Sequence, residues 1–173
     1  MINIIPVPKK LIKKEGSFSL ENVSVFTNDN ADRRVVRALT ELCGEISEKT
    51  GAVCPLYSAE PRGRAITVTH GDGGSEAYRL TVTPDSVEIV SDGAAGAFYG
   101  IQSLRQLIKC GNIPCLEIED EPDFPYRGFY HDVTRGRVNK LEKLKMTAMT
   151  MGMSVKQANR ITGGATNSHP IRF

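Results

Sequence analysis

The chain has 173 residues, of which 40% are hydrophobic and 24% are charged. This is the composition of an ordinary soluble globular protein with enough apolar surface for a core, and it argues against intrinsic disorder. Since 22 Lys and Arg residues stand against 20 Asp and Glu, no strong electrostatic field favours nucleic acid or anionic lipid as a partner.

The N-terminal segment MINIIPVPKK lacks the charged and then apolar pattern of a secretory signal. No apolar run approaches the roughly 20 residues that a membrane-spanning helix needs. We therefore expect a cytoplasmic chain without a membrane partner, although a protein whose leader had been removed would read the same way. The lysines of PKKLIKK indicate a solvated edge strand.

The next elements are a strand and an amphipathic helix. VSVFT, residues 23–27, is rich in β-branched and aromatic residues and predicts a strand. Residues 32–50 predict a helix that ends before Gly51. The apolar residues of this helix recur at spacings of three and four and form one buried stripe: Val35, Leu39, Leu42 and Ile46.

Three further strands are predicted at AITVTH (65–70), YRLTVT (78–83) and SVEIVS (86–91). The turn-forming links GDGGSE and PDS predict that both connections are hairpins. Apolar and polar residues alternate along the second and third of these strands. This alternation is typical of an antiparallel sheet with one face in water.

Residues 92–110 predict a second helix with Asp92 as its N-cap. Its apolar face comprises Ala97 or Phe98, Ile101, Leu104 and Ile108. Gly93, Gly96 and Gly100 predict a smooth side that lies close on the sheet, rather than a phosphate cradle, because GAAGAFYG lacks the GxGxxG spacing. We thus expect an α+β domain over residues 1–121, a mostly antiparallel sheet with two helices on one face.

Residues 122–173 have a different character. DEPDFP predicts a surface linker, since its two prolines forbid a helix across it. YRGFYHDV then predicts a strand, and a helix is expected from about Lys140. One strand and one helix cannot bury themselves, so they resemble the opening βα unit of something larger. From about Met151 the periodicity is lost, which indicates an irregular tail.

Arg127 is the first candidate for chemistry, because its planar fork of donors can hold two sugar hydroxyls or a carboxylate. An ion pair with Asp123 or Asp132 is the structural alternative. His131 and Asp132 are adjacent on a strand and point to opposite faces, so they cannot form a dyad. His70 and His169 lie in unrelated contexts, and we predict neither a metal nor another cofactor.

The four cysteines contain no CxxC pair and no zinc-ligand spacing. They are Cys43, Cys54, Cys110 and Cys115. We expect reduced, partly buried thiols. A disulfide between Cys110 and Cys115 is an alternative for an exported protein.

Two longer stretches carry a family resemblance. They are EAYRLTVTPDSVEIVSDGAAGAFYGIQSLRQLI, residues 76–108, and IEDEPDFPYRGFYHDVTRGRV, residues 118–138. The first resembles the end of the non-catalytic N-terminal domain of glycoside hydrolase family 20, the β-N-acetylhexosaminidases. The second is similar to the junction between that domain and the first strand of the catalytic (β/α)8 barrel. The resemblance spans about residues 1–150.

The resemblance implies hydrolysis of terminal, non-reducing, β-linked N-acetylglucosamine or N-acetylgalactosamine. In such enzymes the acetamido oxygen of the substrate is the nucleophile, a Glu protonates the leaving oxygen and an Asp orients the acetamido group. Arg127 falls on the family arginine that binds hydroxyls of the terminal sugar. Asp132 and Arg135 match an Asp-x-Ser-Arg-like element and are expected to form a supporting ion pair.

The sequence contains no catalytic candidate. The family pair lies in a motif of the type His-x-Gly-Gly-Asp-Glu, which these 173 residues do not contain. Tryptophans that would stack on the sugar are also absent, since the chain has none. We therefore predict an N-terminal fragment that is inactive alone, with a structural domain followed by the truncated start of a barrel.

Two further expectations concern partners. An independent carbohydrate- or partner-binding module is the alternative function, although the aromatic content of 6% is low for a sugar-stacking platform. A dimer through an exposed docking surface is also expected if the domain lacks the barrel that it would pack on. A nucleic-acid partner is not expected.

Overall fold

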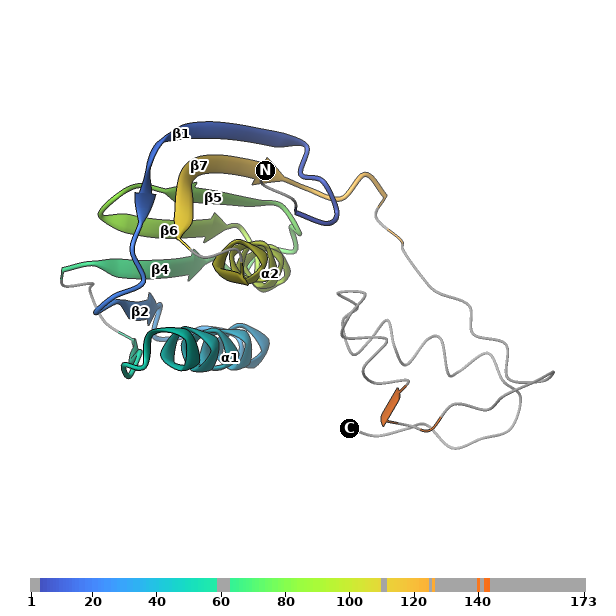
Figure 1. Ribbon diagram of the computed structural model, residues 1–173. Coiled ribbons are helices and arrows are strands. Elements are labelled where there is room, and N and C mark those ends of the chain that lie inside the picture. Colours follow the sequence, from blue (N-terminus) through green and yellow to red (C-terminus); the bar gives the residue numbers. More distant parts are fainter. Residues whose placement is uncertain are drawn as a thin grey trace. The chain divides into compact units, whose positions relative to one another are not determined.

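The computed structural model describes residues 4–58, 63–109 and 112–124, together with 126, 140, 142 and 143. The chain divides into two units, Met1–Pro122 and Asp123–Phe173, and the elements below all belong to the first. In chain order they are β1 Lys10–Phe18, β2 Ser24–Thr27, α1 Arg33–Thr50, β3 Leu56–Tyr57, β4 Ala65–His70, β5 Tyr78–Val82, β6 Ser86–Ser91, α2 Ala94–Lys109 and β7 Ile113–Asp120 (Figure 1).

The strands form one mixed sheet in the order β1-β7-β5-β6-β4-β2-β3. The pairs β1/β7, β7/β5 and β5/β6 are antiparallel, whereas β6/β4, β4/β2 and β2/β3 are parallel. The prediction of a mostly antiparallel sheet is therefore wrong, because three of the six strand pairs are parallel. The α+β class is confirmed.

The parallel half of the sheet arises because β4 and β5 are not a hairpin. His70 and Tyr78 both pair with Ser91, from opposite sides of β6, so residues 71–77 cross over the end of that strand. Gly71 and Gly73 donate backbone hydrogen bonds to the carbonyls of Ser91 (3.2 Å) and Asp92 (2.9 Å). The glycines of GDGGSE predict a chain reversal correctly, but the predicted hairpin is wrong. The segment crosses the end of β6 instead, and its backbone lies against the backbone of residues 91 and 92.

Helix α1 agrees with the prediction to within one residue and has the predicted buried stripe. The Asp32 side chain caps its N-terminus by accepting a hydrogen bond from the Arg34 N–H (2.8 Å). Gly51 ends it in the left-handed conformation, at φ 72°. All four residues of the predicted stripe are buried, and Ala38 and Cys43 are buried with them.

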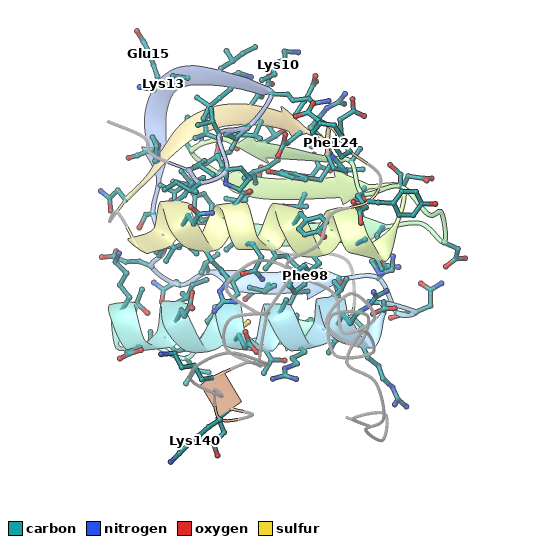
Figure 2. All side chains as sticks on the ribbon, turned by 90° about the vertical axis from the view of Figure 1, so that its right-hand side faces the viewer. Lys10, Lys13, Glu15, Phe98, Phe124 and Lys140 are labelled. Atoms are coloured by element: carbon teal, nitrogen blue, oxygen red, sulfur yellow. The ribbon has the colours of Figure 1, made fainter. Side chains whose placement is uncertain are left out.

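Helix α2 lies beside α1 on the same face of the sheet (Figures 1 and 2), and the buried residues of both helices belong to one core with β2, β4, β5, β6 and β7. The smooth glycine side is confirmed. A Cβ on Gly100 would lie 2.6 Å from Ile89 Cγ2, and one on Gly96 would overlap the carbonyl of Ala77. The helix begins at Ala94, so Gly93 rather than Asp92 directly precedes it.

Strand β1 is an edge strand, as the lysine-rich segment predicts, and Lys10, Lys13 and Lys14 are exposed. Strand β7 is paired on both sides and carries the fully buried Leu116 and Ile118. This strand was not predicted from the sequence. In the part of the chain that the structure describes, neither helix combines the length and the apolar character that a bilayer crossing requires.

Candidate functional site

The site residues that the sequence predicts lie outside the described residues. These are Arg127, Asp132 and Arg135, and the same holds for His131. Their roles stay predictions. The geometry that follows belongs to the first unit.

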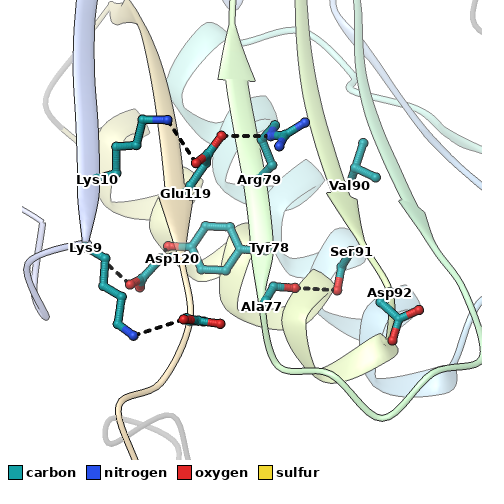
Figure 3. A pocket seen from close by; sticks show the side chains of 11 residues that line it. Lys9, Lys10, Ala77, Tyr78, Arg79, Val90, Ser91, Asp92, Glu119 and Asp120 are labelled. Atoms are coloured by element: carbon teal, nitrogen blue, oxygen red, sulfur yellow. Dashed lines mark hydrogen bonds and ion pairs between the residues drawn. The ribbon is translucent and has the colours of Figure 1, made fainter.

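A cavity of about 510 Å³ lies where β5 begins and where β6 and β7 end. We call it the strand-end hollow (Figure 3). Its walls carry both signs of charge and one tyrosine. It is lined by Lys9, Lys10, Ala77, Tyr78, Arg79, Val90, Ser91, Asp92, Glu119, Asp120 and Glu121.

The acidic side chains contributed by the end of β7 are engaged by neighbouring donors (Figure 3). Glu119 lies between Lys10 Nζ (3.0 Å) and Arg79 Nε (3.3 Å). The hydrogen bond from Lys10 lowers the pKa of Glu119, with Arg79 adding to the effect. Glu121 pairs with Lys9 Nζ at 3.1 Å. The contacts of Glu119 thus link the side chains of three neighbouring strands, β1, β7 and β5.

Tyr78, which lines the hollow, connects β5 with α2 and β7. It is 7% exposed, and its hydroxyl hydrogen-bonds Ser103 of α2 at 2.6 Å. The same hydroxyl donates to Asp120 Oδ2 of β7 at 3.5 Å, while Asp120 Oδ1 accepts from the Lys9 N–H. Burial raises the pKa of Tyr78 to about 12. The phenol is therefore neutral at physiological pH and acts as a structural bridge.

This arrangement does not suit glycoside hydrolysis. A general acid needs a raised pKa, whereas the pKa of Glu119 is lowered by its cations. A sugar-binding platform needs an open aromatic face, and the ring of Tyr78 is buried in the core. The hollow is a seam of ion pairs at the end of the sheet.

His70 is held by the backbone rather than placed for metal binding. Its Nε2 accepts the Asp32 N–H (3.2 Å), and its Nδ1 contacts the Gly71 carbonyl (2.8 Å). The ring thus ties the end of β4 to the start of α1. Among the residues that the structure describes, no three His, Cys, Asp or Glu side chains are grouped to hold a metal ion.

Neither Tyr78 nor Glu119 was singled out by the sequence. The alternation of LEIED, residues 116–120, was the available signal, because it places Glu117 and Glu119 on the face opposite Leu116 and Ile118. It identifies a strand with a charged face. It does not identify the cations of β1 and β5 that meet this face.

The comparisons with known proteins place the chain in a family of glycosyl hydrolases. Residues 1–121 match the family model described as "Glycosyl hydrolase family 20, domain 2". Since this match covers more than half of the 173 residues, the chain belongs to glycosyl hydrolase family 20. The resemblance found in the sequence is confirmed.

Individual relatives agree with the family. The chain is 31% identical over 153 residues to a β-hexosaminidase of Porphyromonas gingivalis, covering 78% of this chain and 19% of that protein. It is 32% identical over 136 residues to a β-hexosaminidase of Vibrio vulnificus, covering 77% of this chain and 15% of that protein. The chain thus spans less than a fifth of either relative.

A solved structure shares the fold. The β-N-acetylhexosaminidase from Bacteroides fragilis superposes with a TM-score of 0.70 at 25% identity. The superposition covers 87% of this chain and 31% of that protein.

Proposed function

We propose that residues 1–121 are the non-catalytic, structural domain of a β-N-acetylhexosaminidase, and that the 173-residue chain does not hydrolyse glycosides on its own. The observation that carries this proposal concerns Asp120 and Glu121, the one Asp-Glu dipeptide of the sequence. Both of its carboxylates are engaged by neighbouring groups. Asp120 accepts hydrogen bonds from Lys9 and Tyr78, and Glu121 pairs with Lys9. These carboxylates are thus engaged by groups of the same domain, and Glu119 beside them is held by Lys10 and Arg79.

The proposed activity of the whole enzyme follows from the family. The substrate would be a terminal, non-reducing, β-linked N-acetylglucosamine or N-acetylgalactosamine, and the acetamido oxygen would attack the anomeric carbon with retention. That chemistry needs a Glu as acid and an Asp that orients the acetamido group. The 173 residues hold no His-x-Gly-Gly-Asp-Glu motif that would supply them.

Residues 122–173 would be a linker and the start of a catalytic barrel, with Arg127 on hydroxyls of the terminal sugar and Asp132 paired with Arg135. This part of the proposal rests on the family match and on the quoted junction sequence. Arg127 suits the role because a guanidinium fork can bind two adjacent hydroxyls at once.

The proposed inactivity is tested with 4-nitrophenyl N-acetyl-β-D-glucosaminide and the purified 173-residue chain. We expect no more nitrophenol release than from a heat-denatured sample. The variant Asp120→Asn/Glu121→Gln serves as a second control. Turnover by the native chain above the heat-denatured sample would overturn the proposal, and its loss in this variant would assign it to Asp120 and Glu121.

The role of Arg127 is tested in a chimaera that joins residues 1–150 to the remaining sequence of the P. gingivalis relative. Loss of a hydrogen bond to a charged group corresponds to about 1.5–3 kcal/mol, so Arg127→Ala should lower kcat/KM by roughly 10- to 100-fold. Arg37→Ala, on the exposed side of α1, is the matched control. Equal activity of the two variants would contradict the assignment.

A further inference from the structure

Two cysteines near the end of α1, Cys43 and Cys54, are tied to the same serine. Gly51 reverses the chain, and the following segment returns along the last turns of the helix. The Cys54 N–H donates to Ser47 Oγ at 2.9 Å, and Ser47 Oγ donates to the Cys43 carbonyl at 2.8 Å. One serine thus bridges the backbones of both cysteines. Each cysteine is 7% exposed.

The two side chains also belong to one buried cluster. A hydrogen bond from Cys43 lowers the pKa of Cys54, while the same bond, together with burial, raises the pKa of Cys43. The pair therefore has unequal members. Cys54 lies beside the exposed Val53 in the segment that leaves the helix, so it is the thiol that an oxidant reaches first, whereas Cys43 is buried within α1.

Cys54 lies in the short segment that leads to the edge of the sheet. The preceding residue, Val53, is 87% exposed, and the following Pro55 carbonyl accepts the Val25 N–H at 2.9 Å. Beyond it, β3 is only two residues long. Local opening of this short segment at the edge of the sheet, next to the exposed Val53, would give a small oxidant access to Cys54.

We propose that Cys43 and Cys54 are a peroxide-sensitive thiol pair that forms a disulfide between α1 and the segment entering β3. The Cys54 thiolate attacks one oxygen of hydrogen peroxide, the O–O bond breaks, and a sulfenic acid and hydroxide form. The Cys43 sulfur then attacks the sulfenic sulfur, and the S–O bond breaks. Two thiols and one peroxide thus give one disulfide and two waters, and a thiol reductant reverses the change.

The sequence offers a direct readout by trypsin digestion. Trypsin cleaves after lysine and arginine, so Cys43 falls in peptide 38–49 and Cys54 in peptide 50–62, whereas the other two cysteines share peptide 110–127. The reduced chain is treated with hydrogen peroxide, its remaining thiols are alkylated at acidic pH, and the digest is analysed by mass spectrometry. We expect peptides 38–49 and 50–62 to be joined and to separate on reduction.

Three variants distinguish the roles. Cys43→Ala should leave Cys54 as a sulfenic acid that dimedone traps, and Cys54→Ala should abolish both products. Cys115→Ala, the matched control with a buried thiol on β7, should retain the link. The disulfide should also raise the thermal midpoint of the chain by about 5 °C or more. If a variant fails to fold, the peptide map of the unaltered chain decides alone.

Two outcomes would overturn the proposal. One is a chain in which peptides 38–49 and 50–62 stay separate after peroxide has oxidised other thiols. The other is a disulfide that joins either peptide to 110–127 instead.

Discussion

The two halves of the sheet are built by different means. In the antiparallel half, β5 and β6 are joined by a three-residue link, residues 83–85, and their alternating side chains face the core. In the parallel half, β6, β4 and β2 become neighbours through α1 and through a crossover of glycines. The comparison teaches that a hairpin follows from local sequence, whereas parallel neighbours here depend on close backbone approach between distant segments.

The largest expected loss of stability comes from a substitution that disrupts the packing of α2 on the sheet. The variant Gly96→Ala places a Cβ against the Ala77 carbonyl and Ser91 Oγ, and overpacking of this kind costs about 2–3 kcal/mol of unfolding free energy. The matched control is Gly44→Ala on α1, where a Cβ would meet nothing within 4 Å. That variant should stabilise the chain by up to about 1 kcal/mol, because alanine favours a helix. Urea titration measures both, and changes of the same sign would contradict the account.

The crossover itself is tested next. A Cβ on Gly93 would lie 2.9 Å from the Ser75 carbonyl and overlap that of Gly73, so Gly93→Ala should destabilise the chain by about 2 kcal/mol. The control is Gly74, which lies in the crossover segment itself and has open space around its Cβ position. Gly74→Ala should therefore change stability by less than about 0.5 kcal/mol. If both variants are neutral in urea titrations, the loop does not pack as described.

The third prediction concerns the ion pairs between α1 and α2, the two helices that cover the sheet. Arg105 of α2 binds Glu45 (Nε to Oε1, 3.1 Å) and Glu41 (Nη1 to Oε2, 3.1 Å) of α1 with 21% of its side chain exposed. Arg105→Met should cost about 1–2 kcal/mol in chemical denaturation. Arg37, exposed and paired with Glu41 in the same helix, is the control, and Arg37→Met should cost about 0.3–0.5 kcal/mol. Equal losses would show that burial does not matter here.

The smallest effect at neutral pH concerns Tyr78 in the antiparallel half. Tyr78→Phe removes the hydrogen bond to Ser103 and should cost about 1 kcal/mol. The folded pKa of about 12 exceeds the ordinary value of 10.0, so the unfolded chain loses this proton first as the pH rises. Stability from Tyr78 is therefore complete below pH 10 and falls by about 1.4 kcal/mol per pH unit toward pH 12. Denaturation curves of the Phe variant should be flatter over that range, and parallel curves would contradict the assignment.

Much of the fold could be predicted from local sequence. The stripe of Val35, Leu39 and Ile46, with Gly51 behind it, defined α1 because helix periodicity and its stop signal are both local. The glycine side of α2 was predicted from its spacing. Strand β7 was missed, and β4 was paired wrongly, because the neighbour of a strand is decided by contacts from far along the chain. Tyr78 illustrates this, since its partners come from two other elements.

The candidate site was accessible to the sequence only through the family. Arg127, Asp132 and Arg135 were assigned by motif resemblance, and their geometry lies outside the described residues. The strand-end hollow was not anticipated, because its ion pairs join the lysines that begin β1 to residues more than 100 positions away. The Cys43–Cys54 pair was also missed, since the spacing of these cysteines fits neither a metal motif nor a redox motif.

The central claim is that the first unit is a self-contained structural domain. It is tested most directly by expressing residues 1–122 alone and comparing its amide NMR spectrum with that of the 173-residue chain. The account predicts a dispersed spectrum whose peaks for β1 to β7 superimpose on those of the longer chain. A collapsed, poorly dispersed spectrum of residues 1–122 beside a well-dispersed one of the full chain would contradict it.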